Sequence, residues 1–338
     1  MVSRILRYVG FAEEAEYNVD PVPEAEFHVD ISEASLDVPS ETQIMFDGSI
    51  GRGQRLHRPG FYSPEGDVTY AIDISTIGWL LKWALGGYVY TADGGEGTDH
   101  NLHEVYAVDD VYLPTFATRL GKDVFEHVFS GCVANEIEIE VSDEFAQATV
   151  SILSAKDSRN DLEDVADLLL PDEFPLAFHE VTMNRNGVAV SPQVRELTLT
   201  VDNTAEAEQG RGLGSRYPYR IPANARNTTM EVTLFFNSMD DFELFWGDPD
   251  GPSDDGTTEF DMDITFDAGD DGKMVVEFPR AIYTGLETQP SGRDEIQQVG
   301  PIQALLADVT LDDDTTVVNT DVYARLENDG EEMVVSGS

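Results

Sequence analysis

A pattern of loop, strand and helix occurs twice in this chain, in residues 51–86 and again in residues 210–247. Each copy begins with a loop rich in glycine and arginine and continues into a strand of alternating apolar and polar residues. A short apolar segment of helical period follows, contains tryptophan and ends at glycine. Two copies of one small fold in a single chain favour a symmetric assembly more than they favour an active site.

Alternation with a period of two is the main secondary-structure signal elsewhere in the chain. It is clearest in residues 136–141, 196–202 and 258–267. In the last of these, Phe260 and Ile264 fall on one face, while Asp261 and Asp263 fall on the other. Such alternation is typical of sheets with one buried and one solvated face, and turn signals such as Asn-Gly and Asp-Gly separate the runs. The sequence therefore predicts a mainly β, antiparallel fold.

Helices are expected in few places. The clearest is residues 75–85, with Ser75 as its N-cap and Gly86 as its stop, and a shorter counterpart is expected at residues 238–246. A third segment, residues 160–170, has a helical period and is closed by proline. Because it lies between the two copies, it is interpreted as part of a helical connector.

The charge of the chain is compatible with either a disordered acidic protein or a folded protein adapted to high salt. Acidic residues number 66 against 20 basic ones, which gives a formal net charge of -46. A disordered acidic chain would lack apolar and aromatic residues, but this chain is 41% hydrophobic and 9% aromatic. We therefore expect a folded protein adapted to molar salt, where the Debye length falls to about 3 Å and self-repulsion is screened. Such a charge also disfavours a groove that grips nucleic acid.

Motifs for catalysis or metal binding are incomplete. His103-Glu104 and His179-Glu180 begin like a zinc-protease helix but lack the second histidine. The Asp-rich loop at 248–255 lacks the ligand order of a calcium hand and is interpreted as a solvated turn. We expect no catalytic, cofactor or metal site. Cys132 is the single cysteine, and neither a secretory leader nor a membrane span is evident, so synthesis and folding in the cytoplasm are expected.

Several segments, taken in order, resemble one family. They are residues 7–17, 21–23, 35–38, 64–70 with 77–82, 130–135, 197–203, and 221–222 with 228–234. Together they resemble the tail tube proteins, or major tail proteins, of viruses with long tails, in their longer form of two domains. Each motif alone is weak, but the order covers nearly the whole chain. The departure is the extreme acidity, which fits a virus of a salt-loving archaeon.

The resemblance implies two tandem tail-tube-like domains of β-sandwich or barrel type, each with one short helix. The expected parts are an N-terminal arm (1–24), a first tube domain (25–156), a helical connector (157–178), a second tube domain (179–326) and a C-terminal tail (327–338).

The function implied by the resemblance is structural. Tube subunits form rings that stack into a hollow tail tube, through which viral DNA is ejected without specific binding. Partners would be further copies of the chain and other tail proteins, assembled in the host cytoplasm. Single-domain relatives form six-membered rings, so two domains per chain favour a trimer with pseudo-sixfold symmetry; a hexamer is the alternative.

Two sets of residues are candidates for these contacts. Acidic stripes expected to face the channel are Glu136, Glu138 and Glu140, and Asp261 and Asp263. Loop arginines expected to reach the next ring are Arg52, Arg55, Arg58, Arg211, Arg216 and Arg220. Alternatives are a baseplate hub or tail-terminator protein with the same fold, or a β-sandwich carbohydrate-active module.

Overall fold

The computed structural model describes residues 7–37, 43–46, 56–95, 99–171, 173–254, 256–288 and 296–334. The fold is mainly β, as the alternating sequence predicts, and the strands pair antiparallel. The helices described are α1 (Ile77–Leu85) and α2 (Asp240–Trp246). Five short 3-10 turns are η1 (Val165–Asp167), η2 (Phe178–Glu180), η3 (Ser191–Gln193), η4 (Ala207–Gly210) and η5 (Gly269–Asp271).

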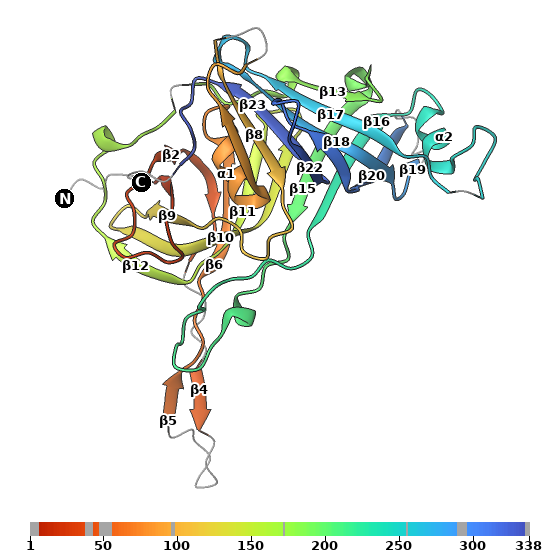
Figure 1. Ribbon diagram of the computed structural model, residues 1–338. Coiled ribbons are helices and arrows are strands. Elements are labelled where there is room, and N and C mark those ends of the chain that lie inside the picture. The colour runs from red at the N-terminus through yellow and green to blue at the C-terminus, as the bar shows by residue number, and fades with distance from the viewer. Residues whose placement is uncertain are drawn as a thin grey trace.

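One sheet crosses the whole molecule and contains strands from both halves of the chain (Figure 1). We call it the spanning sheet. Its strands, in spatial order, are β3 (Ile31–Ala34), β6 (Glu65–Ala71), β11 (Gln147–Leu153), β10 (Glu126–Val141), β15 (Val194–Asp202), β16 (Asn227–Phe235), β20 (Gln297–Ala304) and β19 (Glu287–Thr288). The halves meet where β10 pairs with β15, at the centre of this sheet.

The remaining large pairings form a second layer over the apolar face of the spanning sheet. In the first half the order is β12 (Lys156–Asn160), the start of β10, β9 (Phe116–Gly121), β1 (Val9–Glu13) and β2 (Phe27–Val29). The strands of the second half follow in the order β14 (Val188–Ala189), β13 (Val181–Arg185), β17 (Phe260–Asp267), β18 (Lys273–Tyr283) and β23 (Tyr323–Asn328). Beyond β23 lie β8 (Asn101–Ala107) and β7 (Gly86–Thr91), which belong to the first half. The β23–β8 pairing joins the halves a second time.

Strand β10 serves both layers because its register shifts twice along its length. Its pairing with β9 is interrupted between Phe129 and Cys132, and its pairing with β11 between Ala134 and Glu136. Gly131 lies at the first interruption with a φ of +61, and a Cβ there would meet Ala155 at 2.8 Å. Only glycine fits this bend without strain, so the residue allows one strand to cross from one layer to the other.

Helix α1 lies inside the core, and its start differs from the sequence expectation. The N-cap is Thr76, which makes no side-chain cap, and the Asp73 side chain closes a turn just before the helix by accepting hydrogen bonds from the backbone N–H groups of Ser75 (3.0 Å) and Thr76 (2.8 Å). The Ser75 hydroxyl itself donates to Asp73 (2.6 Å), so Ser75 belongs to this turn and is not the N-cap that the sequence predicts. The predicted stop is confirmed at Gly86, which has a φ of +89.

The expected helix at residues 160–170 is wrong. The segment contains only the turn η1, and Leu168 is already extended. The reason is a competing use of its backbone: Leu169 N–H donates to Nδ1 of His28 (3.0 Å), and Leu169 C=O accepts from His28 N–H (2.8 Å). The chain therefore follows the edge of β2 in extended form. The domain boundaries stay a prediction.

Two small hairpins complete the fold. They are β4 (Gln43–Phe46) with β5 (Leu56–Pro59), and β21 (Ala307–Thr310) with β22 (Val317–Thr320). The β4–β5 hairpin projects far from the body, and the segment around η4 extends in the same direction (Figure 1).

Candidate assembly surfaces

The outer face of the spanning sheet is polar and acidic across five strands. On β10, Ile137 and Ile139 are buried in the core, while the predicted Glu136, Glu138 and Glu140 lie on the opposite face. Strand register places side chains of the same face in rows that run across the sheet. The rows are Asp67–Ser151–Glu136–Asp202–Asn227, Thr69–Thr149–Glu138–Thr200–Thr229 and Ala71–Gln147–Glu140–Thr198–Glu231.

These rows contain carboxylates, hydroxyls and amides but no lysine or arginine. Electrostatic repulsion follows at the first row, where Glu136 lies directly opposite Asp202 across the β10–β15 joint. Partial burial raises the pKa of Glu136, and the nearby Asp202, Glu138 and Asp67 raise it further. We call this surface the acidic face.

The second predicted stripe lies elsewhere. Asp261 and Asp263 are on β17, which pairs with β13 and β18 in the other layer, so the structure does not bring the two stripes together. Asp263 accepts a hydrogen bond from the side-chain amide of Asn184 (2.7 Å). Its neighbour across the strand pair, Glu277, has a pKa raised mainly by burial, against the opposing effect of Arg325.

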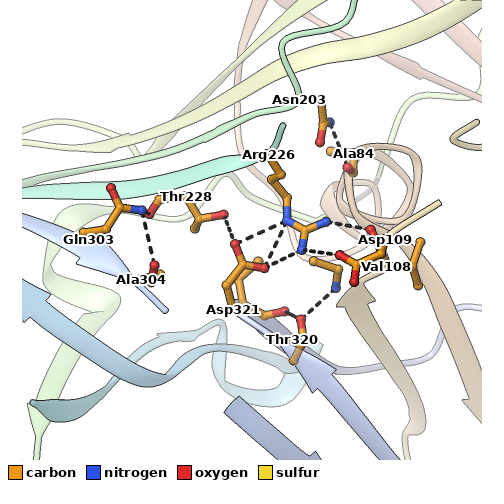
Figure 2. A network of polar contacts seen from close by, with 12 residues as sticks. Ala84, Val108, Asp109, Asn203, Arg226, Thr228, Gln303, Ala304, Thr320 and Asp321 are labelled. Atoms are coloured by element: carbon orange, nitrogen blue, oxygen red, sulfur yellow. Dashed lines mark hydrogen bonds and ion pairs between the residues drawn. The ribbon is translucent and has the colours of Figure 1, made fainter. Parts of the chain in front are cut away.

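The joint between the halves is held by buried polar side chains that the sequence did not single out (Figure 2). The side-chain amide of Asn203, which follows β15, donates to the carbonyls of Ala84 on α1 (2.9 Å) and Ala134 on β10 (3.1 Å). Asn203 is 3% exposed, so these bonds replace water for two carbonyls of the first half.

A second contact between the halves is made by Arg226, just before β16 (Figure 2). Its Nε and NH2 contact Oδ1 of Asp321 at 3.0 and 2.8 Å, and NH1 donates to the carbonyl of Val108 at 2.6 Å. Asp321 also accepts from the hydroxyl of Thr228 (2.7 Å). The guanidinium thus connects the end of β8, from the first half, to the start of β16 and to the turn between β22 and β23, from the second half. We call Asn203, Arg226 and Asp321 the joint clamp.

The residues that follow the first glycine- and arginine-rich loop lie against the second such loop at one end of the molecule. Tyr62, which follows the β4–β5 hairpin, donates its backbone N–H to the carbonyl of Arg216 (2.8 Å), and the Arg216 guanidinium lies 5.1 Å from the Tyr62 ring centre. Arg220 lies over the Tyr112 ring at 4.8 Å. Arg58 and Arg211 are exposed. The predicted Arg52 and Arg55 lie outside the described residues.

The same region exposes apolar groups and contains a cationic surface in an otherwise acidic chain. Leu213 is fully exposed at the outer end of the second loop. We call residues 56–62 and 207–221 the basic end. The opposite end of the spanning sheet contains Asp143 and Glu144, in the turn between β10 and β11.

The described residues outside these surfaces contain no arrangement of side chains typical of a metal site or a reactive thiol. No cluster of three His, Cys, Asp or Glu side chains there is placed to hold a metal ion. Burial raises the pKa of Cys132 to about 12, so its thiol is protonated at neutral pH. None of the helices described has the length and apolar character needed to cross a membrane.

Comparison with known proteins gives one family. A family model described as "Phage tail tube protein" matches residues 6–312. A comparison with curated proteins finds no match.

Proposed function

Because the chain belongs to the phage tail tube protein family, and is thus a structural component of a virion tail, we propose that it assembles into stacked closed rings of three chains, with pseudo-sixfold symmetry. The rings form the hollow tube through which viral DNA is ejected. Assembly takes place in the host cytoplasm, and the extreme charge is an adaptation to a salt-rich host.

The observation that supports three chains is an internal equivalence of strand order. In the first half, β3, β6, β11 and β10 are neighbours, and α1 follows β6. In the second half, β15, β16, β20 and the β18–β19 segment are neighbours in the same order, and α2 follows β16. Each chain therefore supplies two similar units, and three chains supply six.

The β10–β15 joint is a head-to-tail contact between these two units, inside one chain. The equivalent edges at the outside of the pair are β19, which corresponds to the end of β10, and β3, which corresponds to β15. Among the described residues, β3 has no strand partner other than β6, and β19 none other than β20. Pairing β19 of one copy with β3 of the next repeats the internal joint and closes the ring.

We assign the acidic face to the channel. The other side of the spanning sheet is covered by the hydrophobic core. In a ring closed through this sheet, the acidic face therefore points as a whole either toward the channel or away from it. Carboxylates on the channel wall repel phosphate, so DNA passes without the counterion-releasing contacts that would retain it. Glu136, Glu138 and Glu140 are the central lumen residues of this proposal, and the Asp261–Asp263 stripe lies away from the channel.

Stacking of rings is assigned to the basic end. Its arginines, including Arg58, Arg211 and Arg220, meet carboxylates of the next ring, such as Asp143 and Glu144. Each exposed ion pair contributes only about 0–1 kcal/mol, but the contacts repeat around every ring. Other tail proteins bind at the ends of the finished tube.

Electron microscopy of the purified protein in about 2–3 M salt, which screens the charge, tests the proposal. Tubes whose cross-section contains three chains are expected. A protein that stays monomeric at high concentration and high salt contradicts the tube function, and rings of six chains contradict the trimer alone. Copy number in purified virions separates a tube subunit, which is abundant, from a baseplate hub or tail terminator, which is scarce.

A further inference from the structure

The two helices occupy equivalent places but differ in coverage. Trp83 of α1 is fully buried, stacked on Phe116 at 4.4 Å and on Phe27 at 6.2 Å. These rings belong to β9 and β2, so the second layer of the first half covers α1 on its outer side.

Helix α2 has no comparable cover among the described residues. Leu244 and Phe245 pack against the core, but Phe236, Phe242 and Trp246 form a row of rings that is only partly buried. Ring centres are 5.8 Å apart between Phe236 and Phe242, and 5.1 Å apart between Phe242 and Trp246. We call these three residues the α2 patch.

A second apolar surface lies at the other side of the molecule. Leu169 is 54% exposed, Leu170 41% and Phe174 86%, and they lie close together in the sequence on the two sides of residue 172, which is outside the described residues. In a chain with a net charge of -46, such a run of exposed apolar residues marks a contact surface and not a solvated loop. We call these three residues the connector patch.

Both patches lie at the same end of the strands but at opposite edges of the spanning sheet. Leu176, two residues after Phe174, donates its backbone N–H to the carbonyl of Ile72, the residue after β6. Phe236 is the residue after β16, and its N–H donates to the carbonyl of Ile296, just before β20. Since β6 and β16 run in the same direction, the end of the connector near Phe174 and the start of the α2 patch at Phe236 lie toward the same end of the sheet. In Figure 1, α2 and β19 lie on one side of the molecule, and β2 and β12 on the other.

We propose that the α2 patch of each copy binds the connector patch of the next copy of this chain in the ring. This inference rests on the proposed ring and identifies an outer contact beside the pairing of β19 with β3. Phe236 of the α2 patch bonds to Ile296, just before β20, the strand that pairs with β19. The connector is bonded to β2 at Leu169 and to the end of β6, the neighbour of β3, at Leu176. Suppose that the next copy sits against the second half of this copy as the second half sits against the first half. The connector of that next copy then reaches the uncovered rings of the α2 patch.

Acidic residues beside both patches make this contact dependent on salt. Asp240 and Glu243 lie beside the α2 patch, and Asp167 and Glu173 lie beside the connector patch. The acidic rims repel each other, so the apolar contact forms only where salt shortens the Debye length to about 3 Å.

Cysteine cross-linking in assembled tubes tests the contact. The double variant Phe174→Cys with Phe242→Cys, treated with a short bismaleimide, is expected to give covalent multimers in high salt and monomers in dilute buffer. The buried, protonated Cys132 does not compete. Phe242→Cys with Val317→Cys, where Val317 is 59% exposed on β22, is the matched control and is expected not to link copies.

A charge variant provides the second measurement. Phe174→Glu changes a side chain that is 86% exposed, so the thermal midpoint of the monomer should not change. The protein concentration needed for assembly should rise about tenfold, which is the effect of losing one anchoring aromatic residue. Val317→Glu adds the same charge and should leave assembly unchanged.

Three outcomes are decisive. The patch contact is overturned, and the tube function stands, if Phe174→Glu forms tubes normally. The same conclusion follows if tubes link through Glu33→Cys on β3 and Glu287→Cys on β19 but not through Phe174→Cys and Phe242→Cys. The absence of tubes from the unaltered protein at any salt concentration overturns both.

Discussion

Replacing Arg226 with methionine should destabilise the whole chain, because this guanidinium connects its two halves. Arg226 and Asp321 have side chains only 12% and 10% exposed. The substitution keeps the apolar stem but removes the contacts to Asp321 at 2.8 and 3.0 Å and the donor to the carbonyl of Val108 at 2.6 Å. Thr228 remains as a hydrogen-bond donor to Asp321.

The expected loss of unfolding free energy is about 3 kcal/mol. Removing one partner of a buried ion pair costs about 3–5 kcal/mol because a charge stays behind unpaired. Here the remaining hydroxyl of Thr228 and the slight exposure of Asp321 place the cost at the lower end. Adding Asp321→Asn should recover part of the loss, because the double variant no longer buries an unpaired carboxylate.

Urea unfolding, followed by circular dichroism at about 0.5 M and 2 M potassium chloride, measures both the size and the salt dependence of the effect. Arg280→Met is the control, because Arg280 forms a close pair with Glu259 in which both side chains are about half exposed. The Arg226→Met loss should be the same at both salt concentrations and much larger than that of the control. A loss below about 1 kcal/mol, or one that disappears with salt, refutes the assignment of a buried clamp.

Three further substitutions test the joint, the acidic face and a buried carboxyl. Asn203→Ala should lower the unfolding free energy by about 1–3 kcal/mol, measured by urea unfolding, because two buried carbonyls lose their donor; no loss would show that water replaces the amide. Glu136→Gln should stabilise the fold by about 0.2–1 kcal/mol in dilute buffer by relieving repulsion from Asp202. The measurement is the thermal midpoint of the variant against that of the unaltered protein, and an equally large increase in molar salt would contradict this reason. Burial raises the pKa of Glu14 to about 6 from an ordinary 4.5, although Gly131 N–H donates to it. The folded state therefore holds the proton more tightly, and the contribution of Glu14 to stability should fall as pH rises from 4.5 to 6. Unfolding titrations of Glu14→Gln should lack this part of the slope, and an unchanged slope would exclude Glu14 as its source.

Much of the sheet could be predicted from sequence because its signal is local. Alternation in residues 136–141, 196–202 and 258–267 reports which side chains face the core, and the structure confirms strands in all three segments. The two helices at 75–85 and 238–246 were also predicted, to within two residues of their starts. The helix expected at 160–170 failed because periodicity does not reveal whether a core is present. Leu169 and Leu170 are exposed and cover no core, and the backbone of Leu169 is bonded to His28 instead.

The joint clamp could not be predicted, because its signal is distributed over distant segments. Asn203, Arg226 and Asp321 are separated by 23 and 95 residues, and each is a residue type that is ordinarily found at the surface. Their burial follows only from the β10–β15 and β23–β8 pairings, which bring three loop ends together at one point. The repeated glycine- and arginine-rich loops are different: the repeat itself singles out both as candidate contact loops, and Tyr62, which follows the first, contacts Arg216 of the second. A repeated unit thus reveals equivalent surfaces, whereas the contacts that join one unit to the other occur once per chain and leave no repeat to find.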